Sequence, residues 1–374
     1  MPLQLHWFLP THSDGREVAK RATDGAAVPR AVRREPDIDY LAQVAKAADR
    51  FGFDSVLTPT GLFCEDPWLV ASALAGETRR LKFMVALRTG SVTPVVAAQM
   101  SATFQRLSDA RLLLNVVNGG DADEQKRYGD WLDHDQRYAR TAEFLDVFGR
   151  AFAGQPFDFT GEHYRVAGGL LTRPHPVRPP VFVGGSSAAA QGVAGRHADV
   201  FMAWGEPPEP MAALVKQARS HAERHGRDLA CGTRFHVISR DTSAEAWRDA
   251  NRLIEGMDSA RIAAAQKRFQ RTESEGQRRM AALHGGRTDG LEVYPNVWAG
   301  YGLVRPGAGT ALVGSHEEVA ERIEEYHMLG LDHLILSGQP HLEEAYAFGE
   351  GVLPILRARG VLDAGLVTTG SGAA

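Results

Sequence analysis

The chain of 374 residues is 44% hydrophobic and carries a formal net charge of −4, with a pI of about 6.4. This composition supports a large apolar core, and the lack of an overall positive charge argues against nucleic acid as a partner. The sequence has no signal-peptide pattern and no apolar run of the length needed to span a bilayer, so we expect a cytoplasmic protein without membrane contact.

Short apolar segments alternate with helical patterns along the chain. Buried strands are expected at 3–9, 55–58, 81–87, 112–117, 181–183, 200–203, 232–239 and 334–336. Amphipathic helices are expected at 37–51, 135–152, 243–256, 316–329 and 342–356, and others that begin near residues 67, 94 and 187. Eight such strands indicate a parallel sheet that is covered on both faces. The sequence therefore predicts an α/β fold, a (β/α)8 TIM barrel, as a single domain over residues 1–364.

Three segments depart from this alternation. Residues 157–166 contain two short strand patterns around a Thr-Gly-Glu turn, which predicts a hairpin. Residues 257–300, between strands seven and eight, are rich in Arg, Gly and Gln, and a long insertion of this kind is usually a functional lid. A solvated helical excursion is the alternative for this insertion. The tail at 365–374 is expected to be flexible.

Polar residues follow several of the strands, where barrel enzymes place their active sites. They include His12, Cys64, Asn115, Trp204, Gln339 and His341. In strand seven, Arg234 and His236 are two residues apart and so project to the same face. A guanidinium and an imidazole on one face form a poor apolar layer and a good anion site. A cleft in front of them would bind an acidic ligand.

The Gly184-Gly185-Ser186-Ser187 turn joins a buried strand to the start of a helix. Backbone N–H groups at a helix N-terminus, together with two hydroxyls, suit a phosphate monoester. An ordinary helix cap on a flexible glycine turn explains the same residues equally well.

Two other polar segments are better explained without a catalytic or metal-binding role. The carboxylates of Glu65 and Asp66 raise the pKa expected for the neighbouring thiol of Cys64, which favours packing or hydrogen bonding over nucleophilic attack. The run at 133–135, Asp-His-Asp, cannot face one metal ion with all three side chains, and Asp135 is a natural helix cap. We therefore expect no metal site.

Several motifs together resemble the alkanesulfonate monooxygenases. They are WFLPTH at 7–12, CED at 64–66, GGSS at 184–187, WGEPPE at 204–209, RFHVI at 234–238, GLVR at 302–305, GTALVG at 309–314 and PHLEEAY at 340–346. The resemblance extends from the first strand to the last helix. This family belongs to the bacterial-luciferase-like flavin group. Its members take FMNH2 from a separate NAD(P)H-dependent FMN reductase and use O2 to release sulfite and an aldehyde from a C–S bond.

The resemblance implies a role for each residue at the strand ends. Tyr138, Gly184, Gly185, Ser186 and Ser187 are expected to bind the FMN phosphate, with Asn115 and Cys64 near the flavin ring. The catalytic residues Arg234, His236 and Arg305 would hold a small anionic organosulfonate, and Arg305 would arrive as the lid closes. Trp204, Gln339, His12 and His341 would line the substrate pocket. Relatives form dimers or tetramers, so a homo-oligomer is expected.

Gln339 departs from the family pattern, in which a tyrosine commonly stands in a Ser-Gly-Tyr-Pro-His motif. An amide offers both a donor and an acceptor, which suits a hydroxylated substrate. A sulfonated sugar such as sulfoquinovose is therefore a close competitor to a plain alkanesulfonate. Sulfone or long-chain alkane oxidation and deazaflavin-dependent hydride transfer are alternatives that do not require three cationic groups. A non-catalytic flavin-binding barrel is the remaining alternative.

Overall fold

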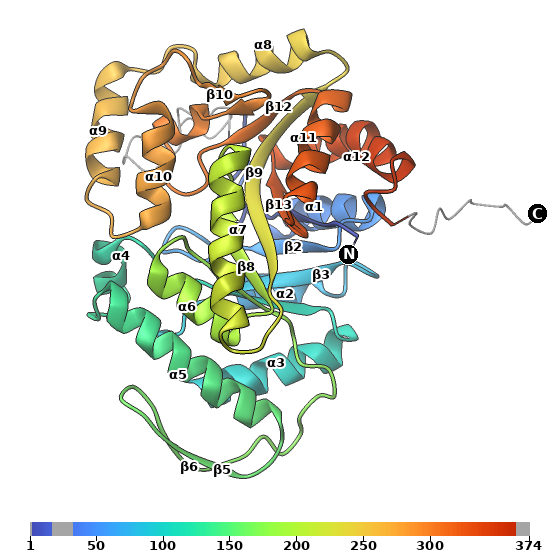
Figure 1. Ribbon diagram of the computed structural model, residues 1–374. Helices are drawn as coiled ribbons and strands as arrows, with labels where there is room; N and C mark the ends of the chain where they lie inside the picture. Colours follow the sequence, from blue (N-terminus) through green and yellow to red (C-terminus); the bar gives the residue numbers. More distant parts are fainter. Residues whose placement is uncertain (1, 17–32, 364–374) are drawn as a thin grey trace, which may run out of the picture.

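Eight parallel strands close into a barrel in the computed structural model, which describes residues 2–16 and 33–363 (Figure 1). The strands are β1 (Gln4–Phe8), β2 (Ser55–Thr58), β3 (Lys82–Leu87), β4 (Leu112–Val116), β7 (Val181–Gly184), β8 (Val200–Trp204), β9 (Ala230–Arg240) and β13 (His333–Ser337). Pairing of β13 with β1 and of β8 with β9 completes the ring. The predicted TIM barrel is therefore confirmed. The tail predicted at 365–374 lies outside the described residues.

Helices cover the outside of this barrel (Figure 1). They are α1 (Ile38–Phe51), α2 (Pro67–Leu74), α3 (Pro94–Ser108), α5 (His134–Phe152), α6 (Ala188–His197), α7 (Pro208–Glu223), α11 (His316–Met328) and α12 (His341–Ala358). Asp133 caps α5, because its side chain accepts the N–H of Gln136 and the Gln136 amide accepts in return. The expectation that Asp135 caps this helix is wrong. None of the helices in the two described ranges is long and apolar enough to cross a membrane.

The barrel interior on the N-terminal side of the rim is filled by apolar side chains. Phe8, Leu57, Met84, Leu113, Phe182, Val200, Met202 and Ile335 form one buried cluster. Closer to the N-terminal ends of the strands, Nε2 of His6 lies 3.1 Å from Nδ1 of His333. Because inward and outward residues alternate along each strand, the next inward positions lie at the C-terminal rim. The fold therefore leaves that rim as the place for a site.

The segment between β9 and β13 is larger than a single helical crossover. It contains α8 (Ser243–Ile254), α9 (Ser259–Phe269), α10 (Glu275–His284), β10 (Glu292–Tyr294), β11 (Val297–Trp298), a 3-10 helix η3 (Gly300–Leu303) and β12 (Ala311–Ser315). Figure 1 shows α9 and α10 side by side at the edge of the barrel. Unpredicted β12 extends the sheet by pairing with the second half of β9, where Ala311 lies opposite His236. Ion pairs of Arg279 with Glu206 and of Arg137 with Glu273 hold α10 and the turn before it over the rim.

Two smaller elements complete the chain. The predicted hairpin is present as β5 (Phe157–Thr160) and β6 (Arg165–Gly169), next to α5 (Figure 1). A short helix that was not predicted, α4 (Ala122–Arg127), follows β4 and is capped by Asp121. It places polar groups at the rim beside the β2–α2 loop, since Glu124 accepts the N–H of Leu62 at 3.1 Å.

Candidate active site at the C-terminal rim of the barrel

Arg234 lies at the mouth of the barrel, directly on the apolar interior. Its guanidinium carbon is 4.1 Å from the centroid of the Phe8 ring, a close cation–π contact. In the sheet, Arg234 lies beside Trp204 of β8 and Ile335 of β13. The aromatic ring thus holds the guanidinium at the mouth, above the apolar core.

His236 is packed more deeply than Arg234. It is 1% exposed, its Nδ1 lies 2.8 Å from Oγ of Ser337, and its Nε2 lies 3.2 Å from the carbonyl oxygen of Ala308. Its ring stacks on Tyr301, with centroids 4.0 Å apart. Because a carbonyl only accepts, Nε2 must carry a proton. His236 therefore joins β9, β13 and the insertion, and adds little surface to the mouth that Arg234 faces.

Arg305 and Gln339 meet at the same rim. Nη1 of Arg305 donates to Oε1 of Gln339 at 3.2 Å, and its guanidinium carbon lies 5.5 Å from the centroid of Tyr301. The Gln339 side chain is buried, and its Nε2 has no hydrogen-bond partner. The arginine that follows the insertion is thus in contact with the end of β13.

His341 is held by Asp14, a residue that sequence reasoning missed. Oδ1 of Asp14 lies 3.0 Å from Nδ1 of His341, and Oδ2 accepts the backbone N–H of His341 at 2.6 Å and the hydroxyl of Tyr40. Burial by itself would raise the pKa of Asp14, but the attraction of His341 and these hydrogen bonds hold that pKa well below its usual range. The His341 ring also packs on Phe8, at 5.8 Å between centroids.

The Gly-Gly-Ser-Ser turn forms a tight cradle at the start of α6. Ser187 caps α6 by accepting the N–H of Ala190 at 3.2 Å, and the Tyr138 hydroxyl donates to the carbonyl of Gly184 at 3.4 Å. A Cβ on Gly185, whose φ is +136°, would lie 2.6 Å from the Tyr138 oxygen. Hydroxyls and N–H groups gathered at a helix N-terminus fit a phosphate monoester.

The other residues expected near a flavin or substrate also line the rim. Asn115 is buried at the end of β4. Burial is the largest cause that raises the pKa of the Cys64 thiol to about 11, with Glu124 contributing in the same direction. The predicted direction for the pKa of Cys64 is confirmed, but its main cause is burial, and the carboxylate that adds to it is Glu124 instead of the expected Glu65 and Asp66. The His12 ring meets Phe63 edge-on at 5.8 Å.

The insertion closes over one side of this rim. A Cβ on Gly276 of α10 would lie 3.1 Å from the Trp204 ring and 3.7 Å from Oγ of Ser186. The pair Arg279 and Glu206, which the sequence did not predict, joins α10 to the β8–α7 loop. A second pair holds the turn before α10, where Arg137 of α5 donates to Glu273 at 2.6 Å. The insertion is therefore anchored both to the β8–α7 loop and to α5.

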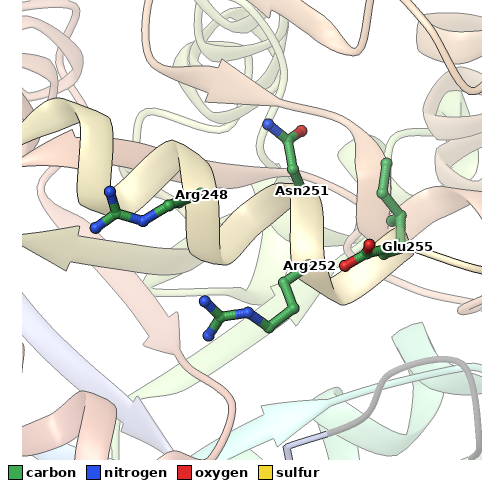
Figure 2. A pocket seen from close by; sticks show the side chains of 5 residues that line it. Arg248, Asn251, Arg252 and Glu255 are labelled. Atoms are coloured by element: carbon green, nitrogen blue, oxygen red, sulfur yellow. The ribbon is translucent and has the colours of Figure 1, made fainter.

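A separate hollow of about 530 Å³ lies on α8. Figure 2 shows four of its lining side chains, Arg248, Asn251, Arg252 and Glu255, projecting from this helix. Because α8 packs on the outside of β9 and β12, this hollow is not part of the rim site. In the described ranges, no group of three or more His, Cys, Asp or Glu side chains could hold a metal ion.

The closed barrel thus carries a cradle suited to a phosphate, two rim arginines and a covering insertion, an arrangement typical of an enzyme with its active site at the C-terminal rim. The family model described as luciferase-like monooxygenase matches residues 3–333, and the chain belongs to this family of flavin-dependent monooxygenases.

Solved structures share the fold at low sequence identity. A riboflavin lyase, RcaE, with modified FMN and riboflavin is 22% identical over 97% of this chain and 93% of that chain, with a TM-score of 0.79. The EDTA monooxygenase EmoA from Chelativorans sp. BNC1 is 22% identical over 97% and 95%, with a TM-score of 0.78. An F420-dependent secondary alcohol dehydrogenase is 16% identical over 94% and 98%, with a TM-score of 0.64.

Proposed function

We propose that the chain is an FMNH2-dependent organosulfonate monooxygenase that uses O2 to cleave a C–S bond. The observation that carries the proposal is that two arginines from separate elements lie at the same rim. Arg234 lies on Phe8 above the core, and Arg305 reaches Gln339 from the insertion. Fork-shaped guanidiniums match the oxygens of a sulfonate as they match those of a phosphate.

FMNH2, delivered by a separate NAD(P)H-dependent FMN reductase, supplies the two electrons that O2 needs for this chemistry. One oxygen atom then enters the aldehyde, the other leaves as water, and the C–S electron pair leaves with sulfite. Tyr138, Ser186 and Ser187 supply hydroxyls for the phosphate, and Gly185 leaves room beside Tyr138. Asn115 and Cys64 line the space for the ring.

The protein's part is to hold the anion and to keep water out. Arg234 is fixed by the Phe8 ring, so its charge is oriented before a ligand arrives. The insertion covers Trp204 through Gly276, which places a wall between the rim and solvent. His236 supports this wall, since it contacts both Tyr301 and Ala308. Arg305 and the insertion thus act together.

A sulfonated sugar is a second candidate substrate, and Gln339 is the observation that favours it. Its Nε2 is buried without a partner, and such a donor costs about 1–3 kcal/mol unless a ligand satisfies it. A sugar hydroxyl can accept this N–H, whereas an alkyl chain cannot. The residue at position 339 is therefore expected to affect which of the two substrates the enzyme prefers, and this preference can be measured.

The test is sulfite release from a panel of alkanesulfonates and sulfoquinovose, with FMN, NADH and an FMN reductase, in the presence and absence of O2. We expect O2-dependent sulfite, and Arg234→Ala should reduce it at least about a hundredfold, because a charge-assisted contact in the transition state is lost. Arg252→Ala is the matched control, since Arg252 lies on the α8 hollow.

Other outcomes identify the alternatives. Oxidation of a sulfone or alkane without sulfite, or hydride transfer with reduced F420 without O2, would replace the proposal by another reaction of this fold. Flavin binding without any turnover would indicate a non-catalytic barrel. A molar mass measured by light scattering tests the expected dimer or tetramer.

A further inference from the structure

The carboxylate of Asp14 makes several hydrogen bonds at the start of α12. Its carboxylate accepts from the N–H of Gly15 at 2.8 Å, the backbone N–H and Nδ1 of His341, and the Tyr40 hydroxyl. An ionised carboxylate has no proton to donate, so Nδ1 of His341 must be the donor of their contact. Both side chains are almost completely buried, at 0% for Asp14 and 1% for His341. The pair therefore fixes the tautomer of His341.

His341 is also placed close to the anion site. It is the first residue of α12, directly after the end of β13, and its ring packs on the same Phe8 ring that lies under Arg234. The imidazole and the guanidinium thus both contact the ring of Phe8. A carboxylate 3.0 Å from Nδ1 stabilises the protonated imidazole in this position.

We propose that Asp14 is a positioning residue that keeps His341 cationic beneath the rim, so that its charge adds to those of Arg234 and Arg305 in attracting the anionic substrate. The inference rests on the proposed function, and it deepens that function by making anion binding depend on pH. Arg234 and Arg305 keep their charge at every working pH. His341 is the group of the three whose charge can change near neutrality, so the affinity for a sulfonate should fall when His341 loses its proton.

The charged neighbours of the pair come from three elements. Tyr40 of α1 donates to Asp14, and Arg34 pairs with Glu343 of α12 and contacts the Tyr40 hydroxyl. Glu344 is occupied by Arg240, which donates to it at 2.7 Å. These two carboxylates are thus matched by arginines, and Asp14 is the carboxylate in direct contact with the imidazole.

The primary test is the NMR titration of His341 in protein with labelled histidine, assigned by the signal lost in His341→Gln. We expect Nδ1 of the unaltered protein to stay protonated between about pH 5 and pH 9. In Asp14→Asn the titration midpoint should move to lower pH by about one unit, a tenfold loss of proton affinity. Asp135→Asn is the matched control, because it breaks an exposed contact with His134 of 2.7 Å and should leave His341 unchanged.

The kinetic test measures how the protonation of His341 affects substrate binding. The KM for the sulfonate should rise above the NMR midpoint while kcat changes less, and Asp14→Asn should move that rise to lower pH. A midpoint unchanged in Asp14→Asn, or a proton on Nε2 alone in the unaltered protein at pH 8, overturns the inference. Locating the proton on His341 in the unaltered protein needs no variant, so this measurement tests the inference even if Asp14→Asn does not fold. Both NMR readouts need no substrate, so they stand apart from the sulfite assay.

Discussion

Arg279 of α10 and Glu206 of the β8–α7 loop form a two-pronged ion pair, with N–O distances of 2.6 and 2.8 Å. The Glu206 side chain is only 6% exposed, so removal of Arg279 would leave a carboxylate buried without this ion pair. The contact joins the insertion to the residue pair that follows Trp204. It is therefore the contact most directly able to keep the insertion over the rim.

Replacement of Arg279 by methionine should loosen the insertion. Loss of one partner leaves a buried carboxylate, which costs on the order of 3 kcal/mol and favours the open arrangement. We expect kcat/KM for the sulfonate to fall about tenfold or more, the yield of sulfite per NADH to fall, and proteolysis within residues 258–310 to become faster. Arg278→Met is the control, since Arg278 is half exposed, pairs with Glu275 of the same helix, and makes only longer contacts, of 3.3 and 3.4 Å, with the carbonyl oxygens of Thr272 and Glu273. Equal behaviour of the two variants would contradict a role for the pair.

Gly276→Ala should disturb the contact between the insertion and Trp204. Alanine usually stabilises a helix relative to glycine by about 1 kcal/mol, but here its Cβ would lie 3.1 Å from the indole ring. We expect KM to rise several-fold and the fluorescence of Trp204 to change. In Gly192→Ala, a helical glycine of α6 with no heavy atom within 4 Å of the added Cβ, only the stabilisation should appear. Unchanged kinetics in Gly276→Ala would show that the contact is not needed.

Sequence patterns were sufficient for the barrel because its strands are buried on both faces. Such strands are nearly continuous apolar runs, and each of the eight lies within a residue or two of its expected position. β12 gave no comparable signal, since its five residues pair only with the outer half of β9 and with β11. The N-cap of α5 was misplaced by two residues because Asp133 and Asp135 are chemically equivalent in sequence, and only the contact of Gln136 distinguishes them.

The rim site was predictable where a residue ends a strand, and much less so where two distant residues meet. Arg234 could be placed from the alternation of its strand. The pairs Arg279–Glu206, Arg137–Glu273 and Asp14–His341 join positions 73, 136 and 327 residues apart, and one sequence carries no record of such contacts. His236 was expected to share an open face with Arg234, but the insertion supplies Tyr301 and Ala308 to cover it.

The pair His6 and His333 should make the fold sensitive to acid. Burial lowers the pKa of His333 from 6.5 to about 4 and also lowers the pKa of His6 well below its ordinary value. The unfolded chain then binds more protons between about pH 4 and pH 6.5, so the stability contributed by this pair is complete above about 6.5 and is lost as the pH falls toward 4. For His333 alone the loss is on the order of 3 kcal/mol.

Urea unfolding between about pH 4 and pH 8 measures this dependence. His333→Leu should be less stable at pH 8, because His6 loses a hydrogen-bond partner, and its stability should change less steeply with pH than that of the unaltered protein. His134→Leu is the control, since that side chain lies at the surface end of α5. An unaltered pH slope in His333→Leu would mean that other groups cause the acid sensitivity.

Gln339→Tyr should change the preference between substrates. A tyrosine replaces the unpartnered Nε2 by a phenol and removes the amide that accepts from Arg305 at 3.2 Å. If Nε2 serves a sugar hydroxyl, the ratio of kcat/KM for sulfoquinovose to that for a plain alkanesulfonate should fall about tenfold or more, which is the loss of one hydrogen bond to a buried group. Sulfite release from the two substrates, measured side by side, gives this ratio. Gln99→Tyr, on the exposed face of α3, controls for the substitution itself. An unchanged ratio in Gln339→Tyr would remove the argument for the sugar, and the two arginines would then support a plain alkanesulfonate.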